Sequence, residues 1–229
     1  ESNVAAFAEI GQRLGRFMIG IGLRYEHVRF NYYEMGILQD GQSKTYNNLF
    51  PSLNIATQVG KVRMGLNYTG KTVRPGYGQL DGAISYINRL TYETGNPYLK
   101  PTKMQTVEYM AQWRRFFAQL SYTYFKDGVY HITEPYGTDD EATIIRTANL
   151  NHRHYFQAFV GGNFQVGIWQ PKVNVGMMKQ WLTLPVNGEP VKMNTPIFMF
   201  QWQNAVKLPF DIWLNVDAQL MTRGWDNNT

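Results

Sequence analysis

The segment between residues 70 and 103 holds the residue types that best suit ligand binding. Tyrosine and arginine most often carry binding energy at recognition sites, and a tyrosine ring can stack on a sugar or an aromatic chelator. We therefore select Arg74, Tyr77, Tyr86, Arg89 and Tyr98 as candidate ligand-binding residues. The alternative is that the segment only folds on itself, with its prolines and glycines setting the backbone, and both interpretations stay open here.

Two further groups could bind metal ions. His152 and His154 stand two positions apart, so a strand would place them on one face, where they could ligate a metal. No third ligand is near in sequence, and we favour a polar strand end near a membrane interface. The acidic run Asp139, Asp140 and Glu141 could hold a divalent cation or bridge lipopolysaccharide; a solvated loop tip is the interpretation we favour.

Other chemistries find no support in the sequence. There is no Ser-His-Asp order, no defensible pair of catalytic carboxylates and no phosphate-cradling glycine loop, so we do not expect an enzyme or a catalytic residue. The chain has no cysteine, which excludes disulfides and thiol chemistry. The net charge of +5 comes from scattered Lys and Arg, and no nucleic-acid partner is expected. We also expect no cofactor and no metal site.

The elements that must position these residues are paired strands. Five times, two strand-like runs are joined by a few residues, and longer connections separate the pairs. The tight turns are predicted near Gly15, Gly60, Arg114, Gly167 and Pro209. The paired runs are 4–12 with 17–28, 49–59 with 62–69, 105–113 with 116–126, 143–164 with 171–183, and 195–207 with 210–221. The run 143–164 is about twice as long as a membrane strand needs, so we expect it to be bent or interrupted near residues 149–153.

Within the runs, apolar and polar residues alternate. A period of two with one apolar and one polar face indicates a half-buried strand. Because charge is costly against hydrocarbon, the apolar face should point outward toward lipid, and the polar face should point inward toward the water-filled interior of a barrel. The outward set is Ile19, Ile21, Leu23, Leu66, Leu120, Val175, Phe198, Phe200, Leu214 and Val216. The inward set is Arg24, Glu26, Arg63, Asn67, Asn215 and Asp217.

Length and composition favour a membrane. The runs are mostly about 9–13 residues long, which suits a tilted strand crossing a bilayer. Aromatic residues make up 15% of the chain, enough for girdles at the two interfaces. Short turns and long loops are typical of outer-membrane barrels, with the turns in the periplasm. We predict an all-β, antiparallel, up-and-down transmembrane β-barrel portion, with about ten long strands in five hairpins. The long loops are expected at 29–48, 70–104, 127–142 and 184–194.

Three sequence elements resemble one family. Asn48-Leu49-Phe50-Pro51-Ser52 begins a strand, Arg74-Pro75 with Leu80 follows, and Gly95-Asn96-Pro97-Tyr98-Leu99-Lys100-Pro101 comes third. Their order and spacing resemble the barrel of TonB-dependent outer-membrane receptors of the type common in Bacteroidetes. The pattern departs at Asp81-Gly82, where Asn-Pro often follows the leucine.

The resemblance implies active import of a large nutrient across the bacterial outer membrane, of the siderophore, glycan or cobalamin class. It also implies partners: the receptor's own plug domain, TonB, and the surrounding lipid and lipopolysaccharide. We expect residues 1–229 to be part of one barrel domain of a larger receptor, whose plug and closing strands are absent from this sequence. The residues around 221–229 should be a strand that runs into a loop. A passive porin-like or structural barrel and a soluble all-β binding or adhesion module remain alternatives.

Overall fold

The computed structural model describes residues 2–31, 33–41, 43–137, 142–186 and 188–225. Most of them lie in strands. The elements are β1 (Ser2–Leu14), β2 (Phe17–Phe30), β3 (Tyr33–Glu34), β4 (Ile37–Leu38), β5 (Lys44–Val59), β6 (Val62–Val73), α1 (Tyr77–Leu80), β7 (Ile84–Asn88), β8 (Thr91–Thr94), β9 (Thr102–Trp113), β10 (Phe116–Pro135), β11 (Thr143–Asn163), β12 (Trp169–Trp181), β13 (Thr183–Val186), β14 (Glu189–Lys192), β15 (Ile197–Lys207), a 3-10 turn (Pro209–Asp211) and β16 (Trp213–Met221).

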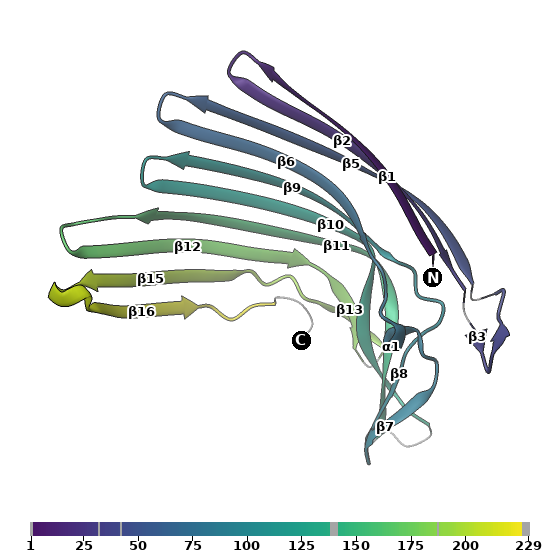
Figure 1. Cartoon of the computed structure of the whole chain (residues 1–229). Helices are drawn as coiled ribbons and strands as arrows, with labels where there is room; N and C mark the ends of the chain where they lie inside the picture. Colours follow the sequence, from purple (N-terminus) through teal and green to yellow (C-terminus); the bar gives the residue numbers. More distant parts are fainter. Residues whose placement is uncertain (1, 32, 42, 138–141, 187, 226–229) are drawn as a thin grey trace.

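Ten long strands form one curved antiparallel sheet, drawn as part of a barrel wall in Figure 1. Their spatial order β1-β2-β5-β6-β9-β10-β11-β12-β15-β16 follows the chain, which confirms the up-and-down topology. The hairpins β1–β2, β5–β6, β9–β10, β11–β12 and β15–β16 confirm the five predicted pairs. All five turns lie at one edge of the sheet (Figure 1).

The turn backbones explain why the turns could be found from sequence. Gly15, Gly60 and Gly167 have φ near +60°, a conformation that glycine adopts without steric cost. Arg114 adopts φ 52° with a side chain present, so this turn carries no glycine signal. The last turn is a 3-10 element beginning at Pro209, with Phe210 and Asp211 also at positive φ.

The register separates the two sets of side chains. In an antiparallel sheet, directly paired residues share a face. Leu66 pairs with Ile55 and Tyr109, and that row continues through Leu120 to Phe198. Asn67 pairs with Asn54 and Glu108, one residue away on the opposite face. The ten residues of the outward set share the first face, hereafter the apolar face. The six of the inward set share the second, hereafter the polar face.

One prediction about the loop end of the sheet is wrong, because residues 128–135 continue β10 instead of forming a loop. Of the bend or interruption expected near residues 149–153, the interruption is absent, since β11 is one strand. An irregularity lies on the partner strand β10, where Asp127 has φ 55°. The pairing skips Asp127, going from Lys126–His152 directly to Gly128–Leu150. The extra length of β11 is used for a second partner, because its start pairs in parallel with β8.

The other long connections also carry structure of their own. The connection 29–48 includes the ribbon β3–β4, and the connection 70–104 includes α1 and the hairpin β7–β8. In the connection at 184–194, β13 and β14 pair with each other, and β13 pairs in parallel with β10. A small hydrophobic core forms here, beyond the loop end of the main hairpins, from Tyr130, Leu182, Leu184 and Met193. Among the described residues, no helix is long and apolar enough to span a bilayer.

Candidate functional site

Aromatic side chains mark two levels on the apolar face. At the turn edge, Trp113 and Phe116 stack with centroids 5.8 Å apart, and Phe164 meets Phe116 edge to face. Six and eight residues farther along β10, Tyr122 and Tyr124 lie on the same face. A tilted strand needs roughly 9–11 residues to cross a bilayer, and aromatic girdles flank the apolar band of membrane barrels. The two levels of rings therefore flank an apolar band, and one membrane thickness, counted as roughly ten positions from the turn-edge rings, ends just beyond Tyr124.

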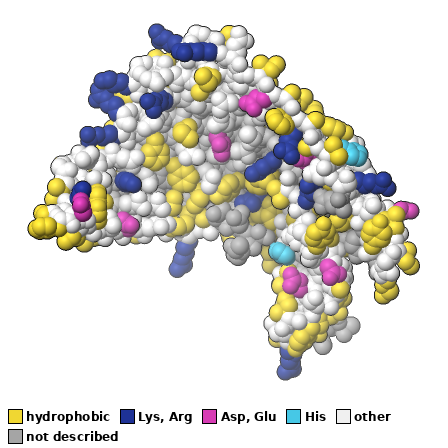
Figure 2. All heavy atoms as spheres, viewed as in Figure 1, with side chains coloured by type: hydrophobic (Ala, Val, Ile, Leu, Met, Phe, Trp, Pro, Cys, Tyr) yellow, Lys and Arg dark blue, Asp and Glu magenta, His cyan; other side chains and the backbone are white. Residues whose placement is uncertain are grey.

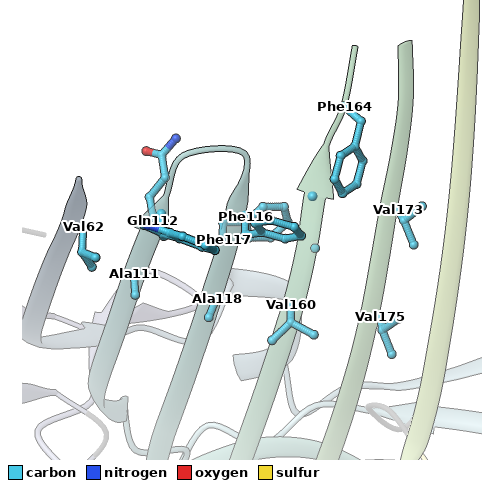
Figure 3. Close-up of a pocket in the computed structure, with 13 residues that line it drawn as sticks. Val62, Ala111, Gln112, Phe116, Phe117, Ala118, Val160, Phe164, Val173 and Val175 are labelled. Carbon is cyan, nitrogen blue, oxygen red and sulfur yellow. The ribbon is translucent and has the colours of Figure 1, made fainter. Parts of the chain in front are cut away.

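A broad hollow lies on the apolar face beside the turn-edge girdle. Figure 3 shows small and branched residues there, Ala111, Ala118, Val160 and Val175, near the rings of Phe116 and Phe164. Its volume is ≈ 620 Å³ and its lining is almost wholly apolar. Such a surface suits hydrocarbon chains and offers no group that would orient a polar ligand, so we do not assign a ligand site to it.

A smaller pocket of ≈ 110 Å³ lies at the loop end of the polar face. β2 supplies Phe30, and β5 supplies Lys44 and Tyr46. Arg74, which precedes α1, and Tyr77, the first residue of α1, close the pocket. Phe30 stacks on Tyr77 at 6.4 Å between ring centroids. The pocket therefore combines two cations with three aromatic rings. It lies farther from the turns than one membrane thickness.

Burial changes the ionisation of two groups in this pocket. Desolvation lowers the pKa of Lys44, and the nearby charge of Lys100 lowers it further. Desolvation also raises the pKa of Tyr46, so its hydroxyl stays neutral at physiological pH. The Lys44 Nζ donates to the backbone oxygen of Tyr98 at 3.4 Å. An anionic group would relieve the cost of holding Lys44 charged beside Lys100.

An ion network ties the pocket to the barrel wall. Glu26 is almost buried and accepts from Arg24 at 2.5 Å and from Arg74 at 3.1 Å. Arg24 and Glu26 come from β2, whereas Arg74 follows β6. One carboxylate between two guanidiniums leaves a net positive charge on this part of the polar face, and it fixes the start of the segment that carries Tyr77.

The sequence elements that carried the family resemblance hold this loop together. The Gly95 N–H donates to the Asp81 oxygen at 2.8 Å, and the Asn96 N–H donates to the Gln79 oxygen at 2.7 Å. A Cβ on Gly95 would lie 2.5 Å from both oxygens, so only glycine fits there. Asn149 of β11 then bonds both the N–H and the oxygen of Lys100. The fold-fixing interpretation therefore accounts for these residues.

The five candidate residues are not gathered in one place. Arg74 and Tyr77 line the pocket. Tyr86 lies on the exposed hairpin β7–β8, in edge contact with Tyr92, and Arg89 lies at the tip of that hairpin. The Tyr98 side chain is exposed, and only its backbone oxygen reaches Lys44. Sequence reasoning missed Phe30, Lys44 and Tyr46 because they stand in the connection 29–48, which offered no motif; their even spacing at 44 and 46 was the available signal.

The structure also places the proposed metal groups. His152 and His154 lie on the apolar face, and each receives a tyrosine: Tyr124 Oη lies 2.6 Å from His152 Nδ1, and Tyr122 Oη lies 2.6 Å from His154 Nδ1. Across the described residues, no three His, Cys, Asp or Glu side chains are grouped so as to hold a metal. The run Asp139–Glu141 lies outside the described residues, as do the last four residues of the strand-to-loop segment predicted at 221–229.

The curved sheet with its two girdles and its separated faces defines a segment of a membrane β-barrel wall. A family model described as the outer membrane protein beta-barrel family matches residues 1–227, and the chain belongs to this family. Its location is accordingly the bacterial outer membrane. No curated protein sequence matches the chain.

Solved structures of similar fold are receptors and transporters by their descriptions. The FrpB iron transporter from Neisseria meningitidis is 14% identical, with a TM-score of 0.61 over 95% of this chain and 32% of that one. The ferric enterobactin receptor PfeA from Pseudomonas aeruginosa is 14% identical, with a TM-score of 0.55 over 96% and 36%. The siderophore receptor PirA from Acinetobacter baumannii is 14% identical, with a TM-score of 0.53 over 96% and 38%. The chain thus spans about a third of the length of these proteins.

Proposed function

We propose that this chain is part of the wall of a TonB-dependent receptor that actively imports a large nutrient through the outer membrane. The pocket among Phe30, Lys44, Tyr46, Arg74 and Tyr77 is the observation that supports this proposal. It lies at the loop end of the polar face, where a substrate arriving from outside first meets the lumen. The same region of the barrel would face the receptor's plug domain.

The chemistry of the pocket favours an anionic, aromatic ligand. Arg74 and Lys44 can form charge-assisted hydrogen bonds to oxygen anions, and Phe30, Tyr46 and Tyr77 offer ring faces for stacking. Aromatic iron chelates carry both features, so we place the siderophore class ahead of glycans and cobalamin. The similar structures described as iron and siderophore proteins are consistent with this order.

Energised uptake separates this function from its alternatives. Cells carrying the full-length receptor are offered a panel of labelled ferric catecholates, oligosaccharides and cobalamin, with and without a protonophore. We expect accumulation of one ligand class, abolished by the protonophore or by loss of TonB. Uptake of small solutes that ignores both treatments would indicate a passive porin. Purification of folded protein without detergent would indicate a soluble module.

Pocket variants test the site itself. We expect Lys44→Gln and Tyr46→Ala each to lower uptake at limiting ligand roughly tenfold, which corresponds to about 1.4 kcal/mol. Tyr86→Ala, on the hairpin β7–β8, is the matched control and should keep normal uptake. Surface levels are measured in parallel by antibody labelling. Normal uptake in both pocket variants, with reduced uptake in Tyr86→Ala, would move the site to the hairpin.

A further inference from the structure

Basic and histidine side chains form a row on the apolar face at the loop-end girdle. The register aligns Thr72, Lys103, Lys126 and His152 across the adjacent strands β6, β9, β10 and β11. Lys103 lies ten positions before Trp113 of the turn-edge girdle, and Lys126 lies ten positions after Phe116. The row therefore lies one membrane thickness from the turns, at the extracellular boundary of the bilayer.

The row carries like charges with no acid to balance them. Lys103 and Lys126 are direct cross-strand partners, and like charges in that position destabilise a sheet. Within the described part of the chain, neither lysine forms an ion pair, and both are exposed. Adjacent strands lie ≈ 4.8 Å apart, so the row spans roughly 10 Å from Lys103 to His152. That width suits one headgroup held by all three side chains.

Tyr124 and Tyr122 each lie within hydrogen-bond distance of one histidine of this region, His152 and His154 respectively. When the Tyr124 hydroxyl donates to His152 Nδ1, the ring proton lies on Nε2, which can then donate to a ligand. The neighbouring row adds Tyr124, His154 and Trp181, and Lys179 lies 4.9 Å from the Trp181 ring centroid. Aromatic side chains beside cations are typical of the headgroup level of a membrane.

We propose that Lys103, Lys126 and His152 bind a phosphate group on a lipid of the outer leaflet, at a defined site on the outside of the barrel. Lysine and Nε2–H donors form charge-assisted hydrogen bonds to phosphate oxygens, and a bound phosphate would compensate the Lys103–Lys126 repulsion. This site is independent of the import pocket, which lies on the other face of the sheet. Its occupant is a membrane component and not a transported substrate.

The test uses the full-length receptor in detergent and diphosphoryl lipid A as the probe, with bound lipid counted by native mass spectrometry. We expect the double variant Lys103→Gln/Lys126→Gln to bind at least about tenfold more weakly, because each basic residue near an anionic surface strengthens the attraction to it. The wild-type receptor should also bind chemically dephosphorylated lipid A at least about tenfold more weakly.

Two further variants keep the test decisive. Lys61→Gln/Lys172→Gln removes the same charge at a turn and on the polar face, and it should bind lipid A as the wild type does. Lys103→Arg/Lys126→Arg keeps the cations and should retain most of the binding. Heat-modifiable gel migration reports folding of each variant. Equal binding of lipid A by wild type and the Gln double variant, or equal binding of the dephosphorylated lipid, would overturn the proposal.

Discussion

Leu66 and Asn67 are consecutive residues of β6, yet they lie on opposite faces of the sheet, and different interactions determine which residues each face accepts. The apolar face around Leu66 is a regular array, in which every position is defined by the period of two and by the distance from the turns. The polar face around Asn67 is regular only near the turns. Toward the loop end it carries an ion network, a pocket and a packed loop. Contact with lipid determines the residues of the apolar face, whereas contacts with particular neighbouring side chains determine those at the loop end of the polar face.

Figure 2 shows a related contrast along the strands. Lys and Arg side chains gather along the turn edge and toward the loop ends, and few lie over the middle of the visible face. The charged groups of the membrane-spanning part are mostly on the polar face, as with Arg24, Glu26 and Asp217. Contact with lipid requires only an apolar residue, whereas an ion pair or a packed contact requires one particular residue. Substitutions on the two faces should therefore have different effects on folding.

The largest expected effect comes from placing one cation on each face. Leu66→Arg would put a guanidinium in the bilayer, which costs about 2–4 kcal/mol near the midplane. Asn67→Arg would face Glu108, its cross-strand partner, and should be tolerated. The folded fraction in the outer membrane, measured by heat-modifiable migration, should fall sharply only for Leu66→Arg. Equal tolerance at the two positions would refute the assignment of the faces.

The second effect is specific to the polar face. Glu26→Gln leaves Arg24 and Arg74 without their shared carboxylate, and hydrogen bonds to charged groups contribute about 1.5–3 kcal/mol each. The segment 74–83 should then exchange its amide hydrogens faster. Glu134→Gln is the matched control, because its ion pair with Arg146 is half exposed and contributes about 1 kcal/mol or less. Comparable exchange in the two variants would mean that Glu26 does not anchor the loop.

A third, smaller effect tests the clamp between the two loop motifs. Gly95→Ala would place a methyl group 2.5 Å from two backbone oxygens, and such overpacking typically costs about 1–3 kcal/mol. Limited proteolysis should cut the connection 70–104 more readily in this variant. Gly78→Ala has open space around it and should behave as the wild type. If both variants resist protease alike, the clamp is not needed for loop order.

The contrast between the faces also explains what the sequence could predict. Alternation and turn residues predicted ten long strands, five turns and the facing of Leu66 and Asn67, because those features depend only on local chemistry. The parallel pairing of β8 with β11 could not be predicted, since it joins segments about fifty residues apart. The continuation of β10 pairs with the nearby start of β11, but its parallel contact with β13 is again about fifty residues away in sequence. The pocket was found in part: Arg74 and Tyr77 stand in a recognisable element, whereas Lys44 and Tyr46 do not.

The smallest expected effect concerns the pH dependence of stability. Burial and the charge of Lys100 lower the pKa of Lys44 below its ordinary 10.5 in the folded protein, so the unfolded chain binds the Lys44 proton more tightly. Stability contributed by this group therefore rises as pH increases through the folded pKa toward 10.5. Lys44→Met removes this titration. Its unfolding midpoint relative to wild type should be most favourable below the folded pKa of Lys44 and should decline as pH approaches 10.5, by a small amount because solvent screens the partly exposed lysine. A pH-independent difference would mean that Lys44 is as well solvated in the folded pocket as in the unfolded chain, and it would weaken the case for an anionic ligand there.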